Sequence, residues 1–306
     1  MKVLLTPDLH ISDKNIENRT DDISKTSLRK LRFIFETAVE HKCSIYQPGD
    51  MWDIPNPSYR FFKRVVSLLN EYKNIDFFTI FGQHDMLYRT RDNTALKALS
   101  ASCSNLHLEW DGGVIKSCSF EKEIPESPKD VNFSILIIHK MIIKKKVWEG
   151  QEEYEYAKTL LSQANFDLII SGDNHSQFYE QIGNRFLFNC GTLIRDTSDL
   201  IDYKPYLVLF DTKICEWEKI YVPIEPSEKV FKLDKIKREK ERDVEIEKFV
   251  DGIKTYRKMG LDFKQNIFTH LKDNEVSNSV KSVFEKAFIR IGDSNEKGRN
   301  KRISRD

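Results

Sequence analysis

The sequence is poor in cysteine, and its five cysteines form no recognisable pattern. They lie at positions 43, 103, 118, 190 and 215, with no Cys-x-x-Cys pair among them. This spacing argues against a disulfide framework and against a zinc site built from cysteines. We therefore expect reduced thiols in a cytoplasmic protein.

Long apolar runs are missing as well. No stretch reaches the roughly 18 consecutive apolar residues that would indicate a membrane-spanning helix. Met1 leads directly into Lys-Val-Leu-Leu, without the apolar region of a secretory signal. The sequence therefore predicts a cytoplasmic protein that does not act in a membrane.

Net charge is nearly absent, because 49 Lys and Arg face 48 Asp and Glu in 306 residues. Such a balance argues against binding nucleic acid by bulk positive charge alone. The charge is unevenly distributed, however. Residues 231–306 carry 20 basic and 14 acidic side chains, a net of +6, which leaves 29 against 34, or −5, for the remainder. With 40% hydrophobic residues, the chain has enough apolar material for a core, so wholesale disorder is excluded.

Short apolar runs alternate with helical periodicity over the first part of the chain. We expect strands over residues 2–6, 44–46 and 76–81, and a helix over residues 25–41. A second helix is expected over residues 58–72, with Asn56 as N-cap and Pro57 at the first helical position. This β-α-β-α-β order predicts a parallel sheet with helices on its faces.

The second part of the chain predicts another sheet. Hairpin-like pieces over 106–123 precede a strand at 133–138 and a helix at 151–164, and strands follow at 167–171, 177–181, 185–188, 206–211 and 214–222. We expect these strands to form a second, more antiparallel sheet. The predicted fold class is α/β, a sandwich of two mixed sheets flanked by helices.

A change of composition near Pro223 and Pro226 indicates a domain boundary. We expect a first domain over residues 1–225 and a helical region over 226–290, with helices at 235–258 and 276–288. Residues 291–306 contain few apolar groups and five basic ones, which is typical of a disordered tail.

Polar clusters follow the expected strands at the positions where open α/β sheets place their ligands. The clusters are Asp8-Leu9-His10, Gly49-Asp50-Met51-Trp52-Asp53, Gly82-Gln83-His84-Asp85, His139 and Gly172-Asp173-Asn174-His175. Carboxylate and imidazole ligands without cysteine suit Mn(II), Fe or Zn rather than a structural zinc site. A carboxylate shared by two such ions would make a hydrolytic centre that activates water and stabilises charge on a phosphoryl group.

Any one of these clusters alone is an ordinary turn; their ordered occurrence is what predicts a metal site. Other residues near them have simpler interpretations. Trp52 fits core packing at least as well as a cover for the metal edge, Asp13 fits loop capping, and Cys190 fits a small buried side chain. His41, His107 and His270 have no partner pattern and are expected in surface or ordinary core positions.

The ordered set Asp8-x-His10, Gly49-Asp50, Gly82-x-His84-Asp85, His139 and Gly172-x-x-His175 resembles the calcineurin-like metallophosphoesterase superfamily over about residues 1–222. The segment 49–58, the overall length and the helical extension are similar to its SbcD-like DNA-repair exonuclease branch. That resemblance implies a two-sheet metallophosphoesterase sandwich and a Mn-dependent phosphodiesterase acting on DNA. It also implies an SMC-type, SbcC-like ATPase partner and a homodimer.

The resemblance assigns roles by position. Asp8, His10 and His175 would bind one metal ion, Asp50 would bridge both ions, and Gln83, His139 and Asp173 would bind the other. His84 would stabilise the transition state or protonate the leaving oxygen, and Asp85 would orient its ring.

Two positions depart from the family pattern. Gln83 stands where the family usually has Asn, and Asp173 stands where it usually has His. Both side chains can still bind a metal ion, so we expect an altered second metal site. The carboxylate of Asp173 favours Mn(II) or Mg(II) over Zn(II).

Several basic residues are candidates for DNA contact, with plain solvated charge as the alternative. They are Arg60, Lys63, Arg64, Arg89, Arg91, Lys140, Lys144, Lys145 and Lys146. Arg89 and Arg91 follow the third polar cluster and are therefore the best placed to touch phosphates. Two other functions stay open: hydrolysis of a phosphoprotein, nucleotide or small phosphoester, and a non-catalytic scaffold, which Gln83 and Asp173 motivate.

Overall fold

The computed structural model describes residues 1–146, 153–256, 267, 271–272, 276–284 and 286. The chain divides into two compact units, residues 1–231 and residues 232–306. The short segment 226–231 therefore groups with the first unit. The tail expected at 291–306 lies outside the described residues.

The first sheet of unit 1 has six strands in the order β13-β12-β1-β2-β3-β4. The strands are β1 (Lys2–Leu5), β2 (Ser44–Gln47), β3 (Phe77–Thr79), β4 (Leu106–Leu108), β12 (Tyr206–Asp211) and β13 (Glu216–Tyr221). The pairs from β1 to β4 are parallel, which confirms the parallel sheet expected for this region. The pairs β1–β12 and β12–β13 are antiparallel, so the sheet as a whole is mixed.

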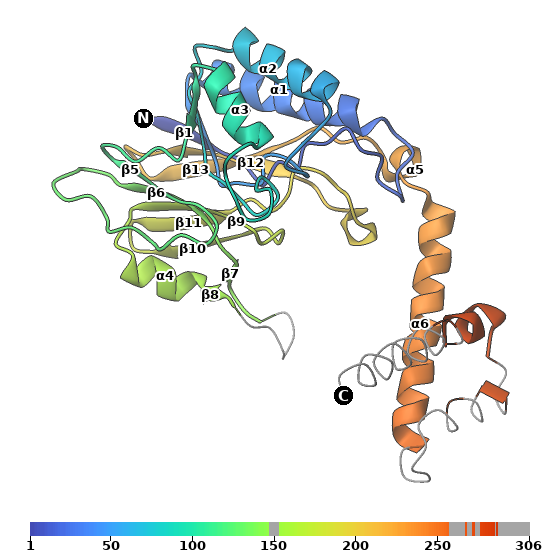
Figure 1. The fold of residues 1–306 in the computed structure, drawn as a ribbon. Helices are drawn as coiled ribbons and strands as arrows, with labels where there is room; N and C mark the ends of the chain where they lie inside the picture. Colours follow the sequence, from blue (N-terminus) through green and yellow to red (C-terminus); the bar gives the residue numbers. More distant parts are fainter. Residues whose placement is uncertain (147–152, 257–266, 268–270, 273–275, 285, 287–306) are drawn as a thin grey trace, which may run out of the picture. The chain divides into compact units, whose positions relative to one another are not determined.

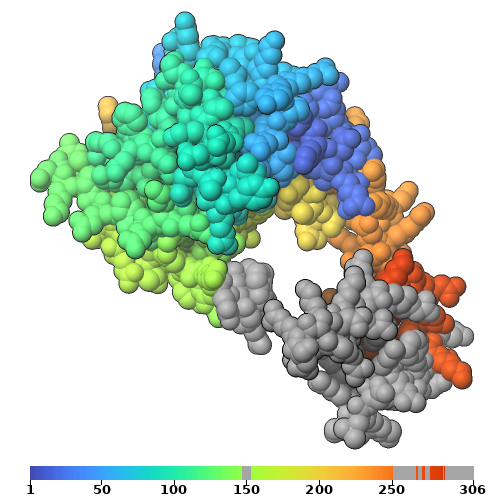
Figure 2. All heavy atoms as spheres, in the orientation of Figure 1, coloured from blue at the N-terminus to red at the C-terminus, as the bar shows by residue number. Residues whose placement is uncertain are grey.

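Three helices, α1 (Ile23–His41), α2 (Tyr59–Glu71) and α3 (Ala95–Ser102), cover one face of this sheet (Figure 1). Leu31, Phe35 and Ala38 of α1 recur at helical spacing and pack on the strands. In the space-filling view, the atoms of this region form a continuous blue-to-cyan surface (Figure 2). The helix α3 was not expected from the sequence.

The start of α2 differs from the expectation. Ser58 is the N-cap, and its hydroxyl oxygen accepts a hydrogen bond from the Phe61 backbone N–H at 3.2 Å. The prediction of Asn56 as the cap was wrong, because Pro57 lies one residue before the cap rather than inside the first turn. The strand expected at 76–81 is also shorter, since only Phe77–Thr79 pair with their neighbours.

The second sheet has the order β10-β11-β9-β6-β5. Its strands are β5 (Ile115–Cys118), β6 (Ile135–His139), β9 (Leu168–Gly172), β10 (Phe178–Ile182) and β11 (Arg185–Asn189). The expectation of a more antiparallel sheet was wrong, because only the pair β10–β11 is antiparallel. The two C-terminal strands β12 and β13 join the first sheet instead.

The segment 106–123 does not form a hairpin. Its two strands belong to different sheets, since β4 pairs with β3 and β5 pairs with β6, both in parallel. The helix expected at 151–164 is shorter: α4 spans Ala157–Gln163. It begins there because β8 (Glu155–Tyr156) pairs with β7 (Ile142–Ile143), and the first residues of the expected helix lie outside the described residues. Two short pieces complete this unit, the 3-10 turn Ser198–Leu200 and α5 (Ser227–Val230).

Apolar side chains alternate along the strands and build three layers of core. On β1, Leu4 packs toward the helices of the first sheet, while Val3 and Leu5 pack between the two sheets. On the second sheet, Ile137 faces the layer between the sheets and Ile138 faces α4. The structure is thus the expected α/β sandwich of two mixed sheets flanked by helices.

The second unit begins with α6 (Leu233–Tyr256), which corresponds to the helix expected at 235–258. Residues 278–284 and 286 are also helical. A small core of Phe249, Ile267, Leu271 and Val280 lies within this unit. None of the helices in the described part of the chain is long and apolar enough to cross a membrane.

Candidate metal centre

Five strand ends place their polar residues at one edge of the sandwich. Asp8 and His10 follow β1, Asp50 follows β2, Gln83 and His84 follow β3, His139 ends β6, and Asp173 and His175 follow β9. Three groups of side chains at this edge have ligand atoms within 4.8 Å of one another: Asp8/His10/His175, Asp8/Asp50/His139 and His10/Asp53/His84. Asp53 is the one member that was not predicted as a site residue. We call these residues, together with Gln83 and Asp173, which hydrogen bonds join to His139, the carboxylate–imidazole cluster.

The first predicted ligand set is compact. The Nε2 atoms of His10 and His175 lie 3.1 Å apart, and the His175 Nε2 lies 4.0 Å from Asp8 Oδ2. Asp8 and His10 are buried, while the side chain of His175 is 38% exposed. Two ring nitrogens and a carboxylate thus converge from the two sheets on one point.

Asp50 lies between the two predicted ligand sets. Its Oδ2 is 3.4 Å from His139 Nε2 and 3.7 Å from His10 Nε2. Its Oδ1 accepts a hydrogen bond from the His84 backbone N–H at 2.8 Å, which fixes the carboxylate. This is the geometry that a bridging ligand requires.

Two carboxylate oxygens of the cluster are buried and have no hydrogen-bond partner: Asp8 Oδ1 and Asp50 Oδ2. A buried carboxylate oxygen without a partner costs free energy, because it has lost its hydration without replacement. A divalent cation would supply the missing partner for both atoms at once. The residues present therefore fit a metal ion.

The backbone is strained at three of the predicted ligands. His10, Asp50 and Asp173 have φ angles of 42°, 51° and 75°, in the left-handed region that non-glycine residues rarely adopt. The His10 N–H donates to the Asp50 carbonyl at 2.9 Å, and the Asp173 N–H donates to Asp8 Oδ2 at 2.8 Å. Hydrogen bonds within the cluster thus hold this strain, which is typical of functional sites.

Two glycines allow the loops to approach the carboxylates. A Cβ atom at Gly82 would overlap the Asp50 carboxylate, and one at Gly172 would overlap Asp8 Oδ1. The glycine at 172 is also required by His139, whose Nδ1 would lie 2.8 Å from that Cβ atom. The close packing of the cluster therefore depends on the absence of these side chains.

Burial and charge set the ionisation of the cluster. Burial raises the pKa of Asp8 well above its usual value and lowers the pKa of His10 to about 3. Burial also opposes the charge of His139, but Asp50 and then Asp8 outweigh it and raise the pKa of His139 to about 10. For Asp50, the charge of His139 overcomes the effect of burial and lowers the pKa to about 2. The carboxylates of Asp50 and Asp8 thus stabilise a positive charge at His139, whereas burial disfavours one on His10.

The second predicted ligand set is joined by hydrogen bonds. Gln83 Oε1 lies 2.7 Å from His139 Nε2, and Gln83 Nε2 donates to Asp173 Oδ1 at 2.7 Å. The other ring nitrogen of His139, Nδ1, lies 2.6 Å from the Pro48 carbonyl oxygen. Asp173 belongs to none of the three ligand groups found among the described residues.

His84 stands at the exposed rim of the cluster, with its ring 4.8 Å from that of His10. The expectation that Asp85 orients this ring was wrong. Asp85 is fully buried and accepts hydrogen bonds from the backbone N–H groups of Met51, Trp52 and Gly82, so its carboxylate shapes the loops instead. Burial raises the pKa of Asp85 to about 7.

The ring of His84 is oriented by Asp53, which the sequence did not single out. His84 Nδ1 donates to the Asp53 backbone carbonyl at 2.8 Å. Because a carbonyl can only accept, Nδ1 carries the hydrogen and Nε2 faces away from this contact. The signal available in the sequence was the place of Asp53 at the end of the second polar cluster.

The simpler interpretations hold for the neighbouring residues. Trp52 is fully buried against Phe61 in the core, and Asp13 contacts the hydroxyl of Ser58 at the start of α2. Cys190 is buried. His107 pairs with Asp76 at 2.8 Å, while His270 lies outside the described residues.

The candidate DNA contacts are mostly engaged within the protein. The guanidinium of Arg91 donates to the Phe120 carbonyl at 2.8 Å and lies 3.5 Å from Glu109, so this side chain is held within the protein. Arg89 is 82% exposed and lies 3.3 Å from Glu121. Lys140 pairs with Glu155 and Lys144 with Glu180, whereas Arg60 is exposed.

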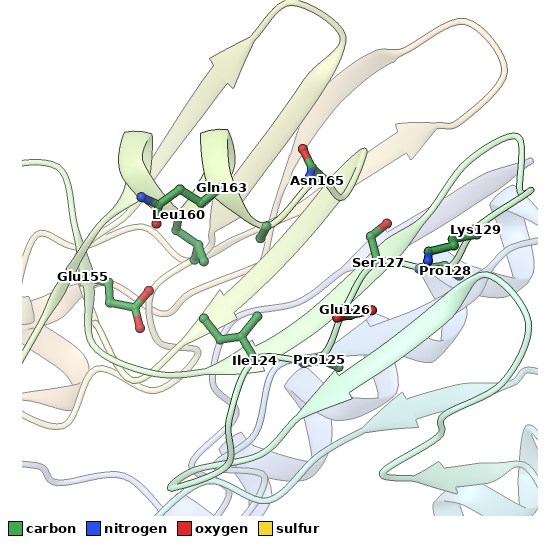
Figure 3. Close-up of a pocket in the computed structure, with 11 residues that line it drawn as sticks. Ile124, Pro125, Glu126, Ser127, Pro128, Lys129, Glu155, Leu160, Gln163 and Asn165 are labelled. Carbon is green, nitrogen blue, oxygen red and sulfur yellow. The ribbon is translucent and has the colours of Figure 1, made fainter.

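A separate cleft of about 650 Å³ lies between the segment 124–129 and α4 (Figure 3). The side chains of Glu126, Lys129 and Glu155 reach its wall, together with apolar groups such as Leu160. None of the predicted metal ligands lines it. The cleft is therefore separate from the carboxylate–imidazole cluster.

No family model matches the sequence, and no curated protein matches it. Several solved structures are similar in fold. A novel archaeal phosphodiesterase matches with a TM-score of 0.40 and 14% identity, over 72% of this chain and 99% of that chain. Vps29 of Entamoeba histolytica, complexed with zinc, matches with a TM-score of 0.35 and 14% identity, over 73% and 100% of the two chains. GAP50, the anchor in the inner membrane complex of Plasmodium, matches with a TM-score of 0.39 and 12% identity, over 74% and 90%.

Proposed function

We propose that the protein is a metal-dependent phosphodiesterase. The observation that carries this proposal is the pair of buried, unpartnered carboxylate oxygens of Asp8 and Asp50, set among three imidazoles. A bound divalent ion supplies an activated water and neutralises the charge that develops on a phosphoryl group. Mn(II) is the proposed ion, because oxygen and imidazole ligands without cysteine suit it, and Mg(II), Fe and Zn(II) are the alternatives to test.

His84 is the proposed proton donor to the leaving oxygen. Its Nδ1 hydrogen is held by the Asp53 carbonyl, so the proton given to the leaving oxygen is a second one, carried on Nε2, and the ring is left neutral afterwards. The exposed position of the ring lets a phosphodiester reach it, while the neighbouring ring of His10 stays buried. The predicted metal ligands would position the phosphate through the ion. The carboxylate of Asp50, which accepts a hydrogen bond from the His84 backbone N–H, connects these ligands to His84.

The proposed substrate is DNA, and the proposed context is an SbcD-like nuclease that works with an SMC-type ATPase. The likeness of the segment 49–58 to that branch supports the proposal. Among the basic residues, Arg60 and Arg89 have exposed side chains with which to meet a phosphate backbone.

A cleavage assay tests the function directly. Purified protein is incubated with end-labelled linear DNA and with circular DNA in the presence of Mn(II), Mg(II) or Zn(II). We expect cleavage with Mn(II), and we expect His84→Ala to lose at least about 100-fold in rate while it still binds the ion. His107→Ala, which changes a half-buried histidine of β4 outside the cluster, should cut DNA at the original rate. Absence of cleavage with every metal, with and without an ATPase partner, would exclude the nuclease.

The substrate class has a separate test. Bis-p-nitrophenyl phosphate reports on diester hydrolysis, and p-nitrophenyl phosphate reports on monoester hydrolysis. We expect a preference for the diester. A preference for the monoester would favour the alternative function, which is action on a phosphoprotein, a nucleotide or a small phosphoester.

A non-catalytic scaffold is the second candidate, and the position of Gln83 favours it. The amide of Gln83 joins two of the predicted ligands, His139 and Asp173, by hydrogen bonds. A scaffold need not bind metal, so counting the ions bound per chain separates the two candidates. The proposed homodimer and ATPase complex are tested by measuring the mass of the protein in solution, alone and with the ATPase.

A further inference from the structure

The side chain of Gln83 spans the second predicted ligand set. Its carbonyl oxygen faces His139 Nε2 and its amide nitrogen faces Asp173 Oδ1, both at 2.7 Å. These are the atoms through which His139 and Asp173 would bind an ion. The amide of Gln83 therefore occupies the ligand atoms that the second ion needs.

The backbone on both sides of Gln83 is fixed. The Gly82 N–H donates to Asp85 Oδ2 at 3.1 Å, and the His84 N–H donates to Asp50 Oδ1 at 2.8 Å. A Cβ atom at Gly82 would overlap Asp50, so this turn has no room to shift toward the carboxylates. With the backbone held in this way, rotation of the Gln83 side chain is the movement that releases both His139 and Asp173.

The first predicted ligand set is independent of Gln83. Asp8, His10 and His175 converge without any hydrogen bond to that side chain, and Asp8 Oδ1 is unpartnered. Asp50 Oδ2 is likewise unpartnered and faces His10 at 3.7 Å. An ion that enters this position displaces one hydrogen bond, between the Nε2 atoms of His10 and His175, and no contact of Gln83.

We propose that the two ion positions are unequal, and that Gln83 is the residue that makes them so. One ion binds tightly at Asp8, His10, Asp50 and His175. A second ion binds only when the Gln83 amide rotates away from His139 and Asp173. This inference rests on the proposed function, since it refines how the same site takes up its metal.

The free energy needed to rotate the Gln83 amide away from its partners determines how much more weakly the second ion binds. A second ion must displace the two hydrogen bonds that the Gln83 amide makes with His139 and Asp173. Since the first position loses one hydrogen bond, the difference is one further bond, to the carboxylate of Asp173, which corresponds to about tenfold in affinity between the two positions. We therefore expect Mn(II) to bind in two separate steps.

The test is equilibrium dialysis with Mn(II), with bound ions counted by mass spectrometry and examined by electron paramagnetic resonance. We expect wild-type protein to bind one tight ion with the signal of an isolated Mn(II), and a second at least about tenfold more weakly. Gln83→Asn, one methylene shorter, cannot reach both partners and keeps an amide oxygen. It should bind two ions of similar affinity with a spin-coupled signal.

Two further variants complete the design. Asp173→Asn keeps an oxygen that can accept from Gln83 and tolerates the left-handed backbone at this position, but it removes the carboxylate ligand. It should retain the tight ion and lose the weak one. Gln181→Asn shortens an exposed amide on β10 and should bind as wild type does.

The outcomes separate the inference from the function. Two ions of equal affinity in the wild type, or unchanged binding in Gln83→Asn, would overturn the inference and leave the phosphodiesterase standing. Binding of no ion at all by the wild type would overturn both. Stepwise binding that becomes equal in Gln83→Asn supports the inference.

Discussion

At the scale of single residues, the smallest side chains of the cluster are as necessary as its ligands. Gly172 has an ordinary backbone conformation, yet a Cβ atom there would overlap Asp8 Oδ1 and lie 2.8 Å from the Pro48 carbonyl oxygen. The Asp8 carboxylate and the Pro48 backbone carbonyl cannot both move away to make room for a Cβ atom. The absence of a methyl group at this position is therefore part of the site.

The variant Gly172→Ala should lose both stability and metal. We expect a loss of about 1–3 kcal/mol in the free energy of unfolding, from the overpacking of the Cβ atom. Urea denaturation with and without Mn(II) measures both effects. Gly112→Ala is the matched control, because its Cβ atom would meet only the side chain of Trp110, at 3.2 Å. An equal loss in the two variants would contradict the prediction.

A second residue of interest lies away from the cluster. Lys30 of α1 is buried and donates to the Leu193 carbonyl at 2.5 Å. Burial, and after it the positive charges of Arg19 and Arg195, lower its pKa to about 7, while Asp21 opposes them. The lysine is therefore held in a place that disfavours its charged form.

The lowered pKa of Lys30 predicts a dependence of stability on pH. Between pH 7 and pH 10 the unfolded chain keeps the proton of Lys30 and the folded chain does not. Stability from this group therefore rises with pH in that window, by at most about 1.4 kcal/mol per unit. Urea denaturation of wild type and Lys30→Met at pH 7, 8.5 and 10 measures the difference. The wild type should gain relative to Lys30→Met as the pH rises, and a constant difference would refute the assignment.

At the scale of elements, the start of α2 shows that an Asn-Pro pair can predict the wrong N-cap residue. Ser58 caps the helix through its hydroxyl, while Asn56 is exposed and precedes it. Ser58→Ala should lower the free energy of unfolding by about 1 kcal/mol, because the Phe61 N–H loses its acceptor. Asn56→Ala should change it by less than about 0.5 kcal/mol. Urea denaturation measures both variants. A larger loss for Asn56→Ala than for Ser58→Ala would mean that Asn56 is the N-cap after all.

Apolar runs predicted most strands but not their partners. Residues 206–211 and 214–222 are recognisable as strands, yet nothing in their composition says that β12 pairs with β1, two hundred residues earlier in the chain. A strand that is buried on both faces fits either sheet equally well. The helix α3 escaped prediction because only Leu96 and Leu99 of its eight residues are buried, too few for a periodic pattern.

The ligands of the cluster were predictable for a different reason. Each of them ends or follows a strand, and the carboxyl ends of parallel strands meet at one edge of a sheet. Residues far apart in the sequence were therefore expected to lie close together. Hydrogen-bond partners were not predictable in this way. Asp85 follows His84 in sequence, but the turn directs its carboxylate to three backbone N–H groups, and the carbonyl of Asp53 reaches the ring instead.

At the scale of the whole molecule, unit 1 contains what its own stability requires. Its three core layers lie within residues 1–231, and its last residue, Phe231, is packed under the guanidinium groups of Arg19 and Arg195, at 5.2 and 5.3 Å from the ring centre. The net of −5 for residues 1–230 includes the buried carboxylates of the cluster, which a metal ion would neutralise. Net charge without metal is therefore a poor guide to its partners.

A chain of residues 1–231 should fold alone. We expect its free energy of unfolding to match that of the corresponding transition in the full chain within about 0.5 kcal/mol, and its tight Mn(II) affinity to be unchanged. Circular dichroism during urea denaturation and equilibrium dialysis provide the two measurements. A fragment that lacks a cooperative transition would contradict this. A fragment that folds but has lost its metal would contradict it as well.

The distance along the chain between the ligands also determines when the cluster can exist during synthesis. His10 and His175, whose ring nitrogens lie 3.1 Å apart, are separated by 165 positions. At a synthesis rate of about 5–20 residues per second, the first ligands leave the ribosome on the order of ten seconds before their partners. The nascent protein therefore completes this cluster only after β9 has been made, and a metal ion bound there would be taken up at a late stage of folding.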